Sequence, residues 1–310
     1  MRDFGVRSWA TGPLLVALAA MLWGTDGIWR TELIAAMPSN AIVLWEHILL
    51  TLATGWILWR DRAALRRLDG GDWTAAIVIA AGASALATVL FTAAFRFASP
   101  TTVLLLQKTQ PLVAISLAAA MLREPLPARF WSMLPLALLG AYFITFGSEN
   151  PLQSLGDGAA VPIGALMALG ASALWGAGTV LGRRLLGKLE FPTLTALRFT
   201  LALPALAIWA AFAGYATPGA AQVGPLFATA LLSGLLGLLL YYRGLRDTPA
   251  AVATLCELSF PITAVLLNIV VLGVGVSAAQ LLGVALLWGA LAGMRHRPVP
   301  VAELVPAASA

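Results

Sequence analysis

Long apolar stretches recur along the whole chain, and they constrain its fold more than any other feature. A helix needs about 20 apolar residues to cross a hydrocarbon core about 30 Å thick. Of the 310 residues, 60% are hydrophobic and only 11% are charged, whereas about a quarter of a typical soluble domain is charged. The stretches are too long and too uniformly apolar for the alternating strands of an outer-membrane barrel. The sequence therefore predicts an all-α integral membrane protein.

Turn and cap residues divide these stretches into ten predicted transmembrane helices. The predicted spans cover residues 13–35, 40–59, 73–95, 100–121, 131–147, 161–182, 192–213, 223–242, 249–271 and 278–294. The first apolar run follows Arg2 and Arg7, as in a signal peptide, but it continues to Trp29, so we expect no cleavage. The tail from residue 299 to 310 is rich in Pro and Ala and is predicted to be disordered.

The positive charges fall mainly on one predicted side of the membrane. If both termini share a side, that side carries 15 of the 19 Lys and Arg residues. The other side carries Arg30 and Arg96, and Lys108 and Arg198 fall within spans. The positive-inside rule then predicts a multi-pass protein of a bacterial-type inner membrane with both termini in the cytoplasm. The net charge of +5 indicates a basic rim against anionic membrane lipid, and we expect no nucleic-acid partner.

The chain repeats short patterns at a nearly constant offset. Residues 20–24 (AMLWG) match residues 172–176 (SALWG) at an offset of 152, and Pro111 and Pro261 occupy equivalent places in the two halves. The predicted repeat contains five spans, over residues 1–150 and 151–310. Because five is odd, the second copy must enter the membrane from the opposite side. Inverted repeats around a central cavity recur in secondary transporters, although a channel of dual-topology ancestry would also fit.

Several short motifs carry a resemblance to a known family. They are Leu22-Trp23-Gly24, Leu174-Trp175-Gly176, Arg198-Phe199, Ala98-Ser99-Pro100 and Leu122-Arg123-Glu124-Pro125. Over nearly the whole chain their order resembles the EamA-type carriers of the drug/metabolite transporter superfamily, and within it the amino-acid exporters. The second half has Gly273-Val274-Gly275 where a Glu-Pro pair would fall. The resemblance implies alternating access through a central cavity lined by the first, third, fourth, sixth, eighth and ninth spans.

One helix face in the first span of each half is a candidate cavity wall. On a helix, Trp23, Asp26 and Arg30 share one face, and Trp175 and Thr179 occupy the equivalent face of the sixth span. The two tryptophans could line a shared cavity, where an indole stacks on a solute and still donates one hydrogen bond, or they could be packing residues. Asp26 could attract a substrate ammonium group, but a pair with Arg30 one turn away is the interpretation we favour.

Polar clusters precede the equivalent prolines Pro111 and Pro261, and they are the strongest functional signal in the chain. A proline frees a backbone carbonyl, which water in a cavity can satisfy. The clusters contain the candidate site residues Gln107, Lys108, Gln110, Glu257 and Ser259. Lys108 could bind the carboxylate and Glu257 the ammonium group of a zwitterion.

The same charges could instead form structural links. Lys108 and Glu257 could pair with each other, or with Glu46 and Arg198. Glu46 and Arg198 occupy equivalent positions in the two halves with opposite charge, and for them we prefer a structural role.

These features predict a carrier that exports amino acids, aromatic or of broader range, by alternating access. A carrier of drugs, nucleotide-linked sugars, other metabolites or lipids is the nearest alternative. A membrane enzyme is less favoured, because the chain has no Gly-x-Ser-x-Gly, His-Glu-x-x-His or nucleotide-loop motif and so offers no catalytic constellation. With only Cys256, His47 and His296 as soft ligands, we expect no metal site and no cofactor. We expect the protein to act as a monomer.

Overall fold

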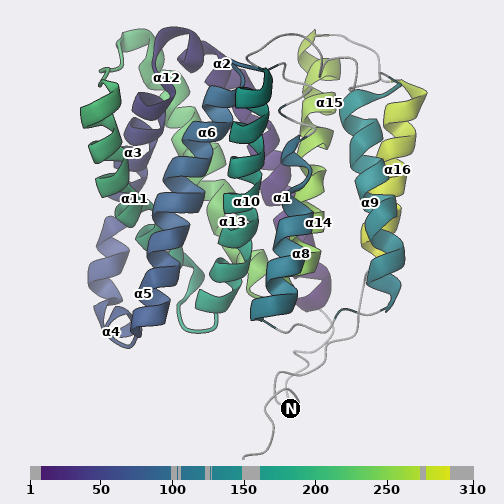
Figure 1. Cartoon of the computed structure of the whole chain (residues 1–310), viewed down its shortest axis with the longest axis horizontal. Helices are drawn as coiled ribbons and strands as arrows, with labels where there is room; N and C mark the ends of the chain where they lie inside the picture. Colours follow the sequence, from purple (N-terminus) through teal and green to yellow (C-terminus); the bar gives the residue numbers. More distant parts are fainter. Residues whose placement is uncertain are drawn as a thin grey trace, which may run out of the picture.

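The chain folds into a bundle of helices. The computed structural model describes residues 8–98, 103, 106–122, 126, 128–148, 161–272 and 277–293, and these contain no strand. Most of the long helices run roughly parallel or antiparallel to one another, close to vertical in Figure 1. The prediction of an all-helical membrane protein is confirmed.

The helices of the first half are α1 (Ser8–Gly24), α2 (Asp26–Ala36), α3 (Ser39–Arg60), α4 (Arg62–Leu65), α5 (Gly70–Ile77), the π-helical η1 (Val78–Leu86), α6 (Ala87–Ala94), α8 (Gln110–Met121) and α9 (Ala128–Phe146). Those of the second half are α10 (Val161–Leu185), α11 (Phe191–Ala213), α12 (Ala220–Ala228), the π-helical η3 (Thr229–Leu236), α13 (Gly237–Leu245), α14 (Ala250–Cys256), the 3₁₀ turn η4 (Glu257–Ser259), α15 (Phe260–Leu272) and α16 (Ala278–Gly293).

Seven helical segments in the described residues are long and apolar enough to cross a membrane. They are Thr11–Ala36, Ser39–Arg60, Gly70–Ala94, Ala128–Phe146, Pro162–Leu185, Phe191–Ala213 and Ala220–Leu245. Three shorter apolar helices, Gln110–Met121, Ala250–Thr263 and Ala278–Gly293, fall within the other three predicted spans. The arrangement of ten spans in two inverted halves therefore stays a prediction. Residues 99–100, 123–125, 273–275 and 299–310, on which further predictions were made, lie outside the described residues.

Helix crossings recur at equivalent places in the two halves. A Cβ atom added at Gly24 would lie 2.6 Å from the backbone oxygen of Phe260, and one added at Gly176 would lie 3.1 Å from that of Gln110. Each first span thus packs closely against the proline-containing helix of the other half, because glycine has no side chain to separate the backbones.

Two further close packings each join one helix of the first half of the chain to one of the second half. Helices α9 and α16 pack against each other at one edge of the bundle, and α3 and α11 pack at the opposite edge (Figure 1). In the first pair, Gly140 and Gly283 face each other, and a Cβ atom at either would lie within 3.0 Å of the other's backbone oxygen.

Four of the predicted spans, the first, third, eighth and ninth, are interrupted near their middles. A turn at Thr25 separates α1 from α2, and η4 separates α14 from α15. The π-helical segments η1 and η3 occupy equivalent places in the third and eighth predicted spans. π-helical turns are frequent at functional sites, so the space that these interruptions surround is a candidate site.

Candidate functional site

A cavity of about 650 Å³ lies between the helices at the level of these interruptions. Its volume is within the range of small-molecule pockets. The lining comes from α1, α2, α3, η1, α6, α8, α10, α11, η3, α13, η4 and the start of α15. The resemblance implied a lining by six spans. The structure adds α3 and α11, which contribute Glu46, His47, Leu50, Arg198 and Phe199.

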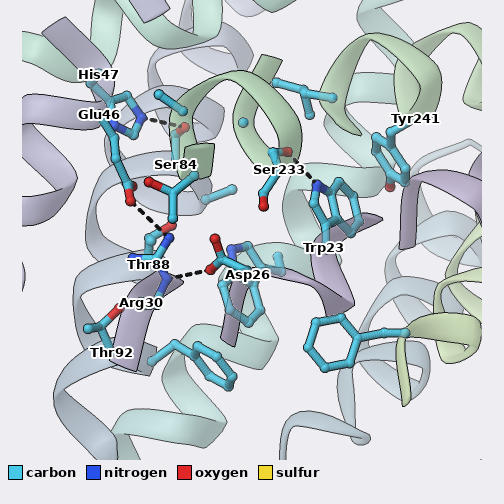
Figure 2. A pocket seen from close by; sticks show the side chains of 18 of the residues that line it. Trp23, Asp26, Arg30, Glu46, His47, Ser84, Thr88, Thr92, Ser233 and Tyr241 are labelled. Atoms are coloured by element: carbon cyan, nitrogen blue, oxygen red, sulfur yellow. Dashed lines mark hydrogen bonds and ion pairs between the residues drawn. The ribbon is translucent and has the colours of Figure 1, made fainter. Parts of the chain in front are cut away.

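Two aromatic pairs form much of the cavity wall, and each contains one of the predicted tryptophans. The ring centroids of Trp23 and Tyr241 lie 5.1 Å apart, and those of Phe91 and Trp175 lie 5.0 Å apart. The indole of Trp23 donates a hydrogen bond to the backbone oxygen of Ser233 at 3.0 Å (Figure 2). Both tryptophans therefore line the cavity and also pack against an aromatic neighbour.

Arg30 joins two carboxylates at another part of the wall. It pairs with Asp26, one turn earlier in α2, and with Glu46 of α3 at 3.1 Å. Figure 2 shows Arg30 between the two acids. The predicted i,i+4 pair is present, and Asp26 also lines the cavity. Because Asp26 begins α2, its carboxylate also lies at the positive end of the helix dipole.

The hydrogen bonds that Glu257 accepts from the described residues all come from neutral donors. Glu257 accepts them from Gln110 Nε2 at 2.5 Å, Tyr241 OH at 2.8 Å and Thr179 Oγ1 at 3.3 Å. No Lys, Arg or His nitrogen of the described residues lies within 4.0 Å of its carboxylate. The described structure therefore contains no direct ion pair between Lys108 and Glu257, and none between Glu257 and Arg198.

Lys108 and Ser259 do not line the cavity, whereas Gln107, Gln110 and Glu257 do. The Lys108 ammonium donates to Gln107 Oε1 at 3.2 Å and lies 5.3 Å from the ring centroid of Phe260. Ser259 is fully buried within the 3₁₀ turn. The structure therefore does not support a direct contact between Lys108 and a solute in this cavity.

Arg198 and Glu46 both line the cavity, although the sequence analysis favoured a structural role for the two residues. The Arg198 guanidinium donates to Ser84 Oγ at 3.1 Å, Tyr242 OH at 3.2 Å and the backbone oxygen of Ala83 at 3.2 Å. Glu46 pairs with Arg30. His47 also reaches Ser84, with Nε2 2.9 Å from Oγ (Figure 2).

Sequence reasoning missed Phe91, Ser84 and Tyr241 as cavity residues. Phe91 and Phe95 share a helix face at i,i+4 in the third span, and Tyr241 has the equivalent place in the eighth, so an aromatic spacing was available as a signal. Among the described residues, no group of three or more His, Cys, Asp or Glu side chains is placed to hold a metal ion.

The family profile and the two relatives described below are all named as transporters. The profile of the EamA-like transporter family matches residues 10–146 and 162–295. The riboflavin transporter ImpX of Fusobacterium nucleatum is 32% identical over 282 residues, which cover 87% of this chain and 92% of that protein. The uncharacterized transporter YwfM of Bacillus subtilis is 25% identical over 280 residues, which cover 88% of this chain and 90% of that protein. One solved crystal structure superposes with a TM-score of 0.72 over 92% of this chain and 96% of that one, at 19% identity, and shows a shared fold.

Proposed function

This chain belongs to the EamA-like transporter family, and we propose that it carries a flavin-like planar metabolite across the inner membrane through the central cavity. Its family and its transporter-named relatives make it a multi-pass membrane transporter rather than an enzyme. The observation that carries the proposal is the cavity walled by the Trp23–Tyr241 and Phe91–Trp175 pairs. Flat aromatic rings stack favourably on such walls.

The polar part of the lining supports the same substrate class. Gln107, Gln110, Thr88 and Thr92 line the cavity beside the aromatic side chains. Their amide and hydroxyl groups can both donate and accept hydrogen bonds. A flavin has a flat ring with carbonyl oxygens and a chain of hydroxyl groups, so its chemistry matches both parts of this lining. The relative that is 32% identical is named as a riboflavin transporter.

An amino-acid substrate, which the sequence predicted, has less support. The predicted zwitterion site needed Lys108 on the cavity wall, and the structure holds Lys108 against Phe260. The named relative carries riboflavin rather than an amino acid. The alternative of another metabolite therefore fits the comparisons better.

We further propose that transport proceeds by alternating access between two inverted halves. Two observations support this mechanism: the family profile matches the chain twice, and close glycine crossings recur at Gly24 and Gly176. If two similar halves have opposite orientations, exchanging their conformations converts a cavity open on one side into one open on the other. Both termini would lie in the cytoplasm.

Transport into liposomes tests the substrate class directly. Purified protein reconstituted into liposomes should accumulate labelled riboflavin faster than protein-free liposomes do. Unlabelled riboflavin should compete, and phenylalanine or tryptophan in large excess should not. Uptake of amino acids without uptake of riboflavin would overturn the proposal in favour of the amino-acid carrier.

A further inference from the structure

Arg198 is a positive charge at membrane depth with no direct ion pair among the described residues, and Glu257 interacts with it at longer range. Arg198 lies seven residues after the start of α11 at Phe191, or about 10 Å along the helix at 1.5 Å per residue. No carboxylate oxygen of the described residues lies within 4.0 Å of its nitrogens. Arg30, which also lines the cavity, is shared by two carboxylates. A cation within a membrane is costly and normally has an electronegative partner.

The guanidinium has hydrogen-bonding capacity left over. It carries five N–H donors in a rigid fork, and three protein acceptors, Ser84 Oγ, Tyr242 OH and the backbone oxygen of Ala83, contact it. The side chain is partly exposed, and the space it faces is the cavity. A group bound in the cavity can therefore accept the remaining donors.

The charges around the cavity favour a neutral substrate over an anionic one. Asp26, Glu46 and Glu257 line it against Arg30 and Arg198, a formal excess of one negative charge, and Lys108 behind the wall brings the formal balance to zero. A phosphate ester would add about −1.5 to −2 at neutral pH. Arg198, which has no direct ion pair in the described structure, cannot offset that added charge beside three carboxylates.

We propose that Arg198 binds the carbonyl-rich edge of a neutral planar heteroaromatic substrate, and that the cavity rejects the phosphorylated form of the same molecule. The inference rests on the proposed function and names the chemistry that the same site selects. A planar fork of N–H donors matches oxygen and nitrogen acceptors along one ring edge. The aromatic pairs then contact the faces of the ring, which an arginine at its edge leaves free.

Binding measurements on the full chain in lipid nanodiscs test this assignment with three probes. They are riboflavin, riboflavin 5′-phosphate, and phenazine, a tricyclic ring without carbonyl groups. Wild-type protein should bind riboflavin at least about tenfold more tightly than the phosphate. Arg198→Gln should weaken riboflavin binding about tenfold or more, as expected for loss of a charged hydrogen bond, and leave phenazine binding within about twofold.

Two further variants separate binding from folding. Arg198→Lys keeps the charge but loses the fork, and should give an intermediate loss for riboflavin. Arg243→Gln removes an arginine that pairs with Asp247 outside the cavity, and should change no affinity. If Arg198→Gln fails to fold, the comparison of riboflavin with phenazine is made on Arg198→Lys.

Three results would contradict the role of Arg198, and they distinguish it from the proposed function. Equal losses for riboflavin and phenazine would make Arg198 a structural residue and overturn the inference, while the flavin carrier stands. Tighter binding of the phosphate ester than of riboflavin would also overturn it, because the site would then select an anion. Failure of the wild-type protein to bind riboflavin would overturn the proposed function and the inference together.

Discussion

Asp26, Arg30 and Glu46 illustrate how this chain holds charge at membrane depth. One arginine is shared by two carboxylates, and the three side chains are only 14%, 20% and 7% exposed for Arg30, Asp26 and Glu46. Burying charge is costly, and removing one partner strands the others. The single arginine therefore has more influence on stability than either acid.

Arg30→Gln should lower the free energy of unfolding by about 3 kcal/mol or more, because it leaves two buried carboxylates without a cation. Asp26→Asn should cost less, since Arg30 keeps Glu46. Thermal unfolding in detergent measures both. The triple variant Asp26→Asn, Arg30→Gln, Glu46→Gln should recover much of the loss, and failure to recover would mean that the cluster is not held by charge pairing.

Lys108 and Glu257 should be coupled more weakly than a direct buried ion pair, because they interact only at longer range. Because no direct ion pair joins them, the coupling energy in a double-mutant cycle of Lys108→Gln and Glu257→Gln should stay below about 1 kcal/mol, against about 3–5 kcal/mol for breaking a buried pair. Glu257→Gln should lower transport more than Lys108→Gln does, because only Glu257 lines the cavity. Strong recovery of stability in the double variant would restore the structural pairing that the sequence left open.

Trp175→Ala should weaken transport by about tenfold, because it removes one aromatic face of the cavity. Trp175→Phe should keep most of the activity. Trp56→Ala is the matched control, since Trp56 is 59% exposed on the outside of α3. Equal transport by all three variants in liposomes, at equal protein content, would return Trp175 to a packing role.

At the scale of helices, the crossing of α9 and α16 depends on two glycines that face each other. Gly283→Val should lower stability by about 1–3 kcal/mol, because a side chain there would overlap the backbone of α9. Gly289→Val lies on the same helix at a place with no described atom within 4 Å, and should change stability by no more than about 0.5 kcal/mol. Thermal shifts of the two variants decide the matter, and equal shifts would contradict the close crossing.

An ion network ties the start of α5 to the end of α10. Lys188 Nζ lies 3.0 Å from Asp69 and 2.5 Å from Asp72, and Asp72 is fully buried. The backbone N–H of Asp72 and the Lys188 ammonium hold the pKa of Asp69 below its ordinary value. Contacts with Asp72 and then Asp69 raise the pKa of Lys188.

The directions of these pKa shifts predict a window of stability. A carboxyl group whose pKa is lowered on folding stabilises the folded state above its unfolded pKa, and this stabilisation is lost as pH falls through its folded pKa. A lysine whose pKa is raised on folding loses its stabilising effect as pH rises through its folded pKa. Wild-type protein should therefore unfold at a higher temperature than Asp69→Asn near neutral pH. The difference should shrink as pH falls below about 4 and vanish once the pH is below the folded pKa of Asp69. Asn keeps the helix cap, so a difference that persists in acid would contradict the charge effect.

At the scale of the molecule, the orientation in the membrane can be tested by thiol labelling. Fifteen of the 19 Lys and Arg residues fall on one predicted side, which the positive-inside rule assigns to the cytoplasm. In a Cys256→Ser background, Thr217→Cys should react with an impermeant thiol reagent in intact cells and Ala63→Cys should not. The opposite pattern would reverse the orientation, and labelling of both or neither would contradict the predicted topology.

The sequence by itself determined the features that depend on composition and local spacing. The apolar runs are long enough to cross a bilayer and lack the alternation of barrel strands, so they predicted helices, which satisfy their backbone hydrogen bonds within the segment. The motif order predicted the family, and the spacing of Asp26 and Arg30 predicted their pair, since residues four apart share a helix face.

Only the tertiary structure decided which helix faces meet. Arg198 was expected to have a structural role and instead lines the cavity. Lys108 was expected in the cavity and instead lies against Phe260, and Glu257 accepts a hydrogen bond from Tyr241. The physical reason is helix rotation. Each turn or wide helical segment, such as η1, η3 and η4, shifts the face that follows it, and the neighbour it then meets comes from a distant part of the chain.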